Sequence, residues 1–222
     1  MARKYSLASK SADATEDSPL LESLNPAQKE AARHVDGPLL ILAGAGSGKT
    51  RVMTHRIAYL ISDGGVHPEQ ILAMTFTNKA CDEMRERVDA ILGEDAADES
   101  SRVTISTFHS LCARLLRWHA KEIGLTADFV IYDDTDQRAL IKRLMEQEDR
   151  GKERSEVRRL RNVIESFKNR GLTPDQAHET AFDQAAEEDV FFYELYQEAL
   201  REANCLDFGD LILAMLEVFR QN

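Results

Sequence analysis

Residues 39–50 read LLILAGAGSGKT, and this is the most informative stretch of the chain. The apolar run 39–42 predicts a buried strand, and a glycine-rich turn then leads into Lys49-Thr50 and a helical pattern. The glycines let successive backbone N–H groups point inward at phosphate oxygens, which is the layout of a phosphate-binding loop. The strict form of this pattern has glycine where the chain has Ala43. A glycine-rich turn that binds nothing is the alternative, and the order of strand, loop, Lys-Thr and helix disfavours it.

The loop predicts nucleotide chemistry. Lys49 is expected to reach the β- and γ-phosphates, and the Thr50 hydroxyl is expected to ligate Mg²⁺, so these two residues are the candidate catalytic groups. The predicted phosphate-binding residues are Ala43, Gly44, Ala45, Gly46, Ser47, Gly48, Lys49 and Thr50.

The composition is that of an ordinary globular chain. Of its 222 residues, 43% are hydrophobic and 30% are charged, and no apolar run is long enough for a transmembrane helix. Residues 1–19 lack the apolar segment of a secretory signal. The three cysteines form no C-x-x-C pair, which predicts thiols in a reducing cytoplasm rather than a disulfide frame or a zinc site. The net charge of −11 argues against nucleic-acid binding by the whole surface but leaves room for a local track.

Apolar segments alternate with helical patterns in the first part of the chain. Strands are expected at 39–42, 71–76 and 103–105, and helices at 26–35, 52–62, 78–92 and 106–118. This alternation predicts an α/β fold with a parallel sheet and a ligand site at the carboxyl edge of its strands. Residues 1–23 show no periodicity and predict a flexible tail.

The pattern changes after about residue 119 to a block that is expected to be all-helical. Asp133 is a good N-cap for a helix through Met145, and Thr173-Pro174 starts a short helix. Further helices are expected at 153–170 and at about 187–203. Segment 206–210 interrupts the block, and 211–219 predicts a final apolar helix.

Five segments occur together in a particular order: LNPAQKEAA at 24–32, GKTR at 48–51, MTFTNKA at 74–80, TFHS at 107–110 and LDFGDLI at 206–212. This order closely resembles the UvrD/PcrA/Rep-type superfamily 1 DNA helicases. The resemblance covers the chain from Leu24 onward, whereas a phosphate loop alone would indicate only an NTPase.

The resemblance implies a P-loop NTPase fold with an incomplete, RecA-like parallel sheet and an inserted all-helical subdomain. The expected domains are a flexible tail at 1–23, a discontinuous and truncated ATP-binding domain at 24–118 and 206–222, and the helical subdomain at 119–205.

Two residues that flank the loop complete the predicted nucleotide site. Gln28 carries both a donor and an acceptor, so its amide can read the donor–acceptor edge of adenine. It matches the family's Q motif, which implies ATP. Arg51 resembles the family's nucleotide-side arginine. The alternative for both Gln28 and Arg51 is a solvent-exposed helix residue that binds no nucleotide. For Arg51 this alternative is a serious one.

Two strand-to-helix turns are expected to contact single-stranded DNA. The resemblance implies that segment 74–80 lies along the single-stranded DNA. Phe76 suits that place because every base offers a π-face for stacking. Packing in the core is the alternative for Phe76. His109 has no ligand partner at a suitable spacing, so a hydrogen-bonding role is expected rather than metal ligation. The predicted DNA-binding residues are Thr75, Phe76, Thr77, Asn78, Thr107, Phe108, His109 and Ser110.

A basic run at 150–161, followed by Lys168 and Arg170, lies in the helical block. It could touch duplex DNA. Because glutamates are interspersed with these cations, a solvated helix face is the favoured interpretation.

The resemblance implies an ATP-dependent 3′–5′ DNA helicase of repair or replication, which couples ATP hydrolysis to translocation on single-stranded DNA and to duplex unwinding. The expected partners are single-stranded DNA, a duplex junction, and repair or replication proteins, with the chain as a monomer away from membranes. Two alternatives stay open. One is the N-terminal part of a RecB/AddA-type helicase–nuclease subunit, and the other is a truncated, non-catalytic nucleotide- or DNA-binding module.

No apolar strand that ends in an Asp-Glu pair follows 211–219, although family members place the Walker B carboxylates for Mg²⁺ and the attacking water there. The second motor domain with its arginine fingers is also missing. We therefore expect an N-terminal fragment that binds nucleotide weakly at best and does not unwind DNA alone. Strand separation by the 222-residue chain, with Lys49→Ala as the negative control, would contradict this expectation.

Overall fold

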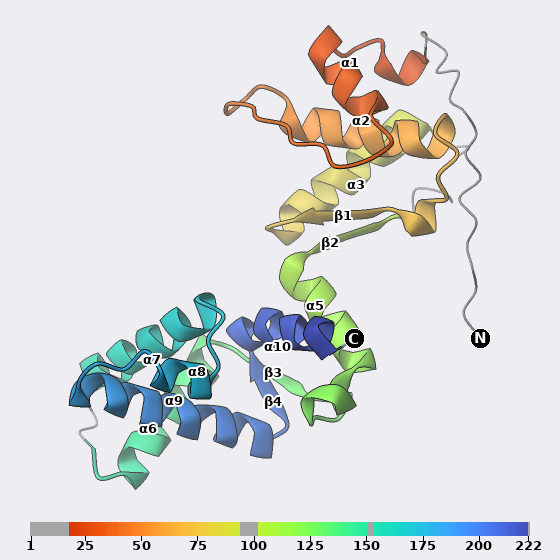
Figure 1. Ribbon diagram of the computed structural model, residues 1–222. Coiled ribbons are helices and arrows are strands. Elements are labelled where there is room, and N and C mark those ends of the chain that lie inside the picture. The colour runs from red at the N-terminus through yellow and green to blue at the C-terminus, as the bar shows by residue number, and fades with distance from the viewer. Residues whose placement is uncertain (1–17, 94–101, 151–152, 222) are drawn as a thin grey trace. The chain divides into compact units, whose positions relative to one another are not determined.

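The computed structural model describes residues 18–93, 102–150 and 153–221. The chain divides into two compact units, Met1–Thr107 and Phe108–Asn222 (Figure 1). Each unit has buried clusters of its own and contains a short pair of parallel strands.

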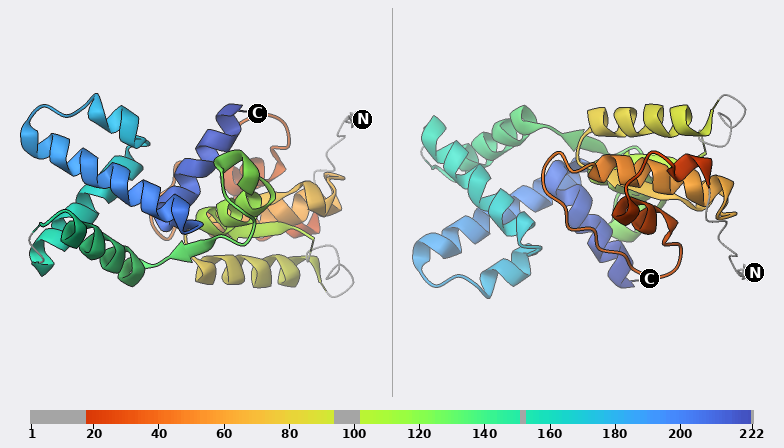
Figure 2. Two further views of the ribbon diagram at one scale, coloured as in Figure 1. Left: turned by 90° about the horizontal axis from the view of Figure 1, so that it is seen from below. Right: turned by 90° about the horizontal axis from the view of Figure 1, so that it is seen from above.

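A two-stranded parallel sheet and two helices form the main core of the first unit. Strands β1 (Leu72–Thr75) and β2 (Thr104–Thr107) pair in the register Leu72↔Thr104 to Thr75↔Thr107. Helix α2 (Lys49–Ser62) packs on α3 (Asn78–Leu92), and α3 lies alongside the sheet in both views of Figure 2. The buried side chains of this core are Ile57, Ile61, Ile71, Ala73, Cys81, Met84, Val88, Val103 and Ile105.

Short elements before α2 pack against it. They are the 3₁₀ turn η1 (Pro19–Leu21) and helix α1 (Pro26–Arg33). Another 3₁₀ turn, η2 (Pro68–Gln70), comes after α2 and precedes β1. Leu21 and Leu24 are buried with Tyr59 of α2. Residues 18–23, which the sequence placed in a flexible tail, therefore belong to the packed unit, and 1–17 lie outside the described residues.

The cap predicted for the first helix is confirmed. The Asn25 side chain accepts a hydrogen bond from the Gln28 backbone N–H at 2.9 Å, and Gln28 Oε1 accepts one from the Asn25 N–H at 3.1 Å. This reciprocal box satisfies two donors that the helix leaves unpaired, with Pro26 at the first helical position. The predicted helix at 78–92 is also confirmed, and the Thr77 hydroxyl caps it by accepting from the Ala80 N–H at 3.1 Å.

The strand predicted at 39–42 is wrong. These residues belong to the long loop that leads from α1 to α2 (Figure 1), and Leu40 and Leu42 are 81% and 86% exposed. A parallel strand that is buried on both faces needs a neighbouring strand and covering helices. Among the described residues, β1 pairs only with β2, so this apolar run has no ladder to join.

The second unit is mostly helical but contains a strand pair. Strands β3 (Val130–Tyr132) and β4 (Cys205–Asp207) pair in parallel, so the expectation of an all-helical block at 119–205 is wrong. Three-residue strands are too short to show a clear alternation of apolar and polar residues. The helices of this unit are α5 (Phe108–Trp118), η4 (Ala120–Ile123), α6 (Asp134–Gln147), α7 (Arg154–Asn169), α8 (Pro174–His178), α9 (Gln184–Glu202) and α10 (Phe208–Gln221).

Two buried clusters hold the second unit together. The larger joins α6, α7, α8 and α9 around Tyr193 and Tyr196, and the smaller joins α5 and α10 around Leu116 and Leu211. The predicted caps are confirmed, because Asp133 accepts from the backbone at the start of α6 and Thr173 does so at the start of α8. Helix α10 packs on α5 within this unit, and the assignment of 206–222 to the nucleotide-binding domain stays a prediction.

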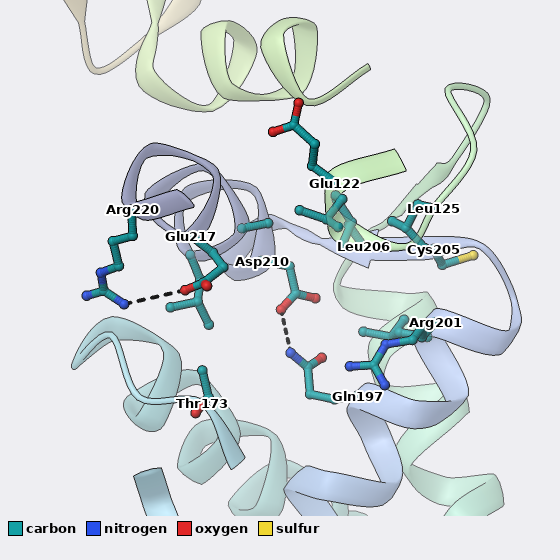
Figure 3. Close-up of a pocket in the computed structure, with 14 residues that line it drawn as sticks. Glu122, Leu125, Thr173, Gln197, Arg201, Cys205, Leu206, Asp210, Glu217 and Arg220 are labelled. Carbon is teal, nitrogen blue, oxygen red and sulfur yellow. Dashed lines mark hydrogen bonds and ion pairs between the residues drawn. The ribbon is translucent and has the colours of Figure 1, made fainter. Parts of the chain in front are cut away.

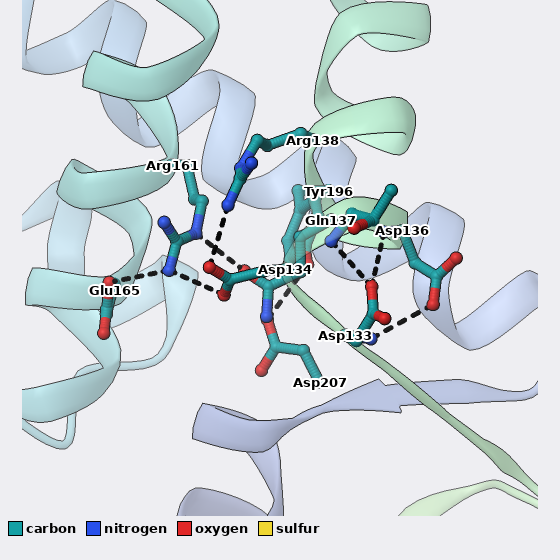
Figure 4. A network of polar contacts seen from close by, with 10 residues as sticks. Asp133, Asp134, Asp136, Gln137, Arg138, Arg161, Glu165, Tyr196 and Asp207 are labelled. Atoms are coloured by element: carbon teal, nitrogen blue, oxygen red, sulfur yellow. Dashed lines mark hydrogen bonds and ion pairs between the residues drawn. The ribbon is translucent and has the colours of Figure 1, made fainter.

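Arginines of the basic run bind acidic side chains on neighbouring helices. Arg161 Nη2 lies 2.8 Å from Asp134 Oδ1 of α6 (Figure 4), and Arg159 Nη1 lies 2.9 Å from Asp189 Oδ1 of α9. The favoured interpretation of a solvated face is wrong for Lys168, which is buried. The run therefore links the helices of the unit to one another.

Candidate functional site

The predicted phosphate loop ends where α2 begins. Gly46 and Gly48 have φ angles of 75° and 90°, in the left-handed region that favours glycine. Gly48 is the N-cap of α2 and offers no side chain to the first turn of the helix. The backbone N–H groups at the start of α2 are therefore free of any side-chain cap, which is the property that an anion site at a helix N-terminus requires.

Lys49 is bound by its own loop. Its Nζ donates to the carbonyl oxygens of Ala43 at 2.9 Å and Gly44 at 2.7 Å, and the Ser47 hydroxyl also donates to Gly44 O at 2.7 Å. The side chains of Lys49 and Thr50 are exposed. To reach a phosphate, the ammonium group must exchange two neutral carbonyl acceptors for charged oxygens, and such charge-assisted hydrogen bonds are stronger.

Gln28 is brought to the phosphate loop. Its Nε2 donates to Ser47 O at 3.1 Å, and a Cβ added at Gly48 would lie only 2.9 Å from the same nitrogen. The amide oxygen is used in the α1 capping box, so Gln28 links α1 to the loop, and its side-chain amide has one further N–H and one further lone pair. Arg51 points elsewhere, since its Nη2 donates to Ser23 O at 3.0 Å.

The two predicted DNA segments follow strands that end together. Thr75 and Thr107 are the last residues of β1 and β2 and pair with each other. Both are buried, and the Thr75 hydroxyl donates to Thr77 O at 3.0 Å and lies 2.8 Å from Cys81 Sγ. The Thr75 and Thr77 hydroxyls are thus used within the protein, the second as the cap of α3.

The aromatic residues of these segments are accessible. Phe76 is 90% exposed, which excludes the alternative that it packs in the core, and Phe108 is 41% exposed. Asn78, His109 and Ser110 are exposed as well. These side chains have the accessibility that contact with a nucleic-acid strand requires.

Sequence reasoning did not single out Phe208 as a site residue. It is the first residue of α10, directly after β4, and its ring lies edge-to-face with His109 at 5.9 Å between centroids. The signal was available, because segments 74–80, 107–110 and 206–212 each place a phenylalanine at the turn from a strand to a helix.

A buried ionic cluster fixes the start of α10. Lys168 Nζ lies 2.7 Å from Asp207 Oδ2 and 2.7 Å from Asp210 Oδ1, and the lysine side chain is 2% exposed. The Tyr196 hydroxyl donates to Asp207 Oδ2 at 3.0 Å, and Gln197 Nε2 donates to Asp210 Oδ1 at 2.8 Å (Figure 3). The two aspartates also cap each other's backbone N–H groups at 3.0 and 2.9 Å.

The two carboxyl groups of this cluster respond differently to their surroundings. Burial raises the pKa of Asp210, against the attraction of Lys168. Burial also opposes ionisation of Asp207, but the charge of Lys168 and several hydrogen bonds outweigh it and lower the pKa of Asp207. The cluster therefore depends on its single buried cation.

A cavity of about 210 Å³ adjoins the cluster on the side of α9 and α10 (Figure 3). Apolar and polar side chains both line it, and the hydrogen-bonded pair Asp210 and Gln197 is among them. The three cysteines of the chain are free thiols. Among the described residues, no group of three His, Cys, Asp or Glu side chains is arranged to hold a metal ion, and none of the helices is both long and apolar enough to cross a membrane.

The chain belongs to the UvrD/REP helicase N-terminal domain family, whose family model matches residues 24–222. This confirms the resemblance found in the sequence. The chain is 44% identical over 202 residues to the ATP-dependent DNA helicase PcrA of Staphylococcus epidermidis, which covers 91% of this chain and 27% of that protein. It is 43% identical to PcrA of Staphylococcus aureus with the same coverage. The chain thus spans 27% of the length of these curated relatives.

Proposed function

We propose that this chain is the ATP-binding and single-strand-binding part of an ATP-dependent 3′–5′ DNA helicase. In that protein, ATP hydrolysis drives translocation on single-stranded DNA and the unwinding of duplexes at a junction, in repair or replication. The observation that carries this proposal is the exposed ring of Phe76, directly after a strand whose last residue is buried, in a chain of the helicase family. The partners proposed are DNA and repair or replication proteins, in a reducing cytoplasm.

The phosphate loop supports the ATP-binding half of the proposal. Gly46 and Gly48 already have left-handed backbone, and the loop side chains stand clear of the core. Lys49 would hold the β- and γ-phosphates, Thr50 would ligate Mg²⁺, and Gln28 would face the adenine. Bound ATP with Mg²⁺ would supply the phosphoryl transfer that powers the motor.

Replacing Phe76 with alanine tests the DNA-binding half. Loss of one stacked base should weaken binding of a fluorescein-labelled oligo-dT by about five-fold or more, because stacking contributes about 1–3 kcal/mol per base. The measurement is fluorescence anisotropy at fixed salt. Phe182→Ala is the matched control, because Phe182 is an equally exposed phenylalanine, at 95%, outside the predicted segments. Equal affinities of the wild-type chain and Phe76→Ala would contradict the stacking role.

A further inference from the structure

The cavity beside the ionic cluster is lined by side chains of both α9 and α10 (Figure 3). Gln197, Leu200 and Arg201 line it from α9, and Leu213 and Ala214 are among the residues that line it from α10. Residues three and four positions apart share one side of a helix, so α9 turns its three side chains toward one space. All lining residues belong to the second unit, so the cavity lies within that unit.

The apolar part of the lining fits a small ring. Leu200, Leu206 and Leu213 contribute to it together with Ala214. The cavity measures about 210 Å³, and a cavity of about 150 Å³ in another protein is sufficient for benzene. One six-membered ring with a small substituent therefore has room here, and its contact with the leucines would remove apolar surface from water.

The carboxyl groups of the lining each have a partner. Glu122 Oε1 lies 2.8 Å from His119 Nδ1, and Glu217 Oε2 lies 3.7 Å from Arg220 Nη1. Asp210 belongs to the buried cluster around the lysine of α7. Among the described residues that line the cavity, no unpaired carboxylate is therefore offered to a cationic ligand.

Arg201 differs from these charged groups. It is exposed, and within 18–93, 102–150 and 153–221 its guanidinium has neither an ion pair nor a hydrogen bond. An incoming carboxylate can therefore accept two hydrogen bonds from the planar guanidinium without displacing an existing partner. Glu122 and Glu217 line the same cavity and repel a second negative charge, which favours a monoanion over a phosphate ester or a dicarboxylate.

We propose that this cavity is a binding site for a small aromatic monocarboxylate, whose ring lies among the leucines and whose carboxylate binds the guanidinium of Arg201. The site goes beyond the proposed function, because none of its lining residues is among the predicted nucleotide or DNA residues. A ligand here contacts both α9 and α10. Since it binds only the folded state, it stabilises the second unit.

The test compares 4-methylbenzoate with its neutral analogue 4-methylbenzamide, which has nearly the same shape. Binding of each compound to the full chain is measured by saturation-transfer difference NMR. Arg201→Met should weaken binding of the carboxylate by about ten-fold or more, because the charged hydrogen bonds are lost. The same substitution should leave binding of the amide nearly unchanged, which also shows that the cavity is intact.

Two further variants sharpen the comparison. Arg158→Met is the matched control, because Arg158 is an exposed arginine of α7 that does not line the cavity. Its loss changes the net charge equally and should leave both affinities unchanged. Ala214→Met fills the cavity with a longer side chain and should abolish binding of both compounds, while the fluorescence of Trp118 reports whether the unit remains folded.

Four outcomes would overturn the inference. The first is a wild-type chain that does not bind 4-methylbenzoate up to the solubility limit of the compound. The second is an Arg201→Met variant that binds the carboxylate as tightly as the wild type does. The third is a folded Ala214→Met variant that keeps wild-type affinity, which would place the ligand elsewhere. The fourth is an equal loss of affinity in Arg158→Met and Arg201→Met, which would indicate a general effect of charge. None of these outcomes bears on the binding of ATP or DNA.

Discussion

Replacing Lys168 with methionine is expected to lower the free energy of unfolding of the second unit by about 3–5 kcal/mol. The substitution keeps the length of the stem but leaves Asp207 and Asp210 buried without a cation. Breaking one side of a buried ion pair costs far more than breaking a surface pair, because the remaining charge cannot reach water. Urea unfolding is the measurement, followed by the fluorescence of Trp118, the single tryptophan of the chain, which lies in α5 of this unit.

Lys142→Met is the matched control for that experiment. Lys142 is 56% exposed and lies 3.9 Å from Glu146, so its loss should cost about 1 kcal/mol or less. Equal effects of the two substitutions would contradict the importance of the buried cluster.

The stabilities of the wild type and of Lys168→Met should also respond differently to pH. In the wild type, the lowered pKa of Asp207 contributes stability above its unfolded pKa of about 3.9, and this contribution is lost as the pH falls through the folded value. In Lys168→Met, burial without the cation should raise the pKa of both carboxyl groups, so lowering the pH neutralises them. The difference in unfolding free energy between the two proteins should therefore shrink from pH 7 to about pH 5. A constant difference would contradict this account.

Replacing Lys49 with alanine is the second change with a large expected effect. Removal of the ammonium group should weaken ATP binding by about ten-fold or more, because hydrogen bonds to charged groups are worth about 1.5–3 kcal/mol. In the structure this group is held by the carbonyl oxygens of Ala43 and Gly44, so it already lies at the loop. The measurement is titration with a fluorescent ATP analogue in the presence of Mg²⁺.

Lys79→Ala serves as the control for nucleotide binding. The Lys79 side chain is 86% exposed at the start of α3, and its Nζ lies 4.0 Å from Glu83 Oε1, which is a long ion-pair distance. Its removal changes the net charge by the same amount as Lys49→Ala without touching the loop. If both variants bind the analogue with wild-type affinity, the assignment of residues 43–50 to phosphate binding is contradicted.

Local signals in the sequence predicted the helix starts well. A helix N-cap needs only a side-chain acceptor at one position and the backbone N–H groups of the turn that follows it. The caps at Asn25, Asp133 and Thr173 meet this condition. The bounds of α3 follow from the apolar stripe of one helix in the same way. Such features depend on neighbours within a few residues, which the sequence displays directly.

Features that depend on distant partners were predicted less well. The run 39–42 has the composition of a strand, but strand formation needs a hydrogen-bonding neighbour that composition does not reveal. Lys168 looked like part of a solvated basic face, because its partners Asp207 and Asp210 lie 39 and more positions further along the chain. The contact between the rings of Phe208 and His109 joins two helices, so only the fold reveals it. The link between Gln28 and Ser47 likewise depends on the fold, although the order of the motifs had placed both near one site.

Photo-crosslinking of an iodouridine-containing single-stranded oligonucleotide to the full chain reports which residues lie against single-stranded DNA. Mass spectrometry should find the crosslinks in peptides that contain Phe76 or the segment 107–110, and excess unlabelled oligo-dT should remove them. Crosslinks confined to other parts of the chain, or none at all, would contradict the claim that these strand-to-helix turns form the single-strand track of a DNA helicase.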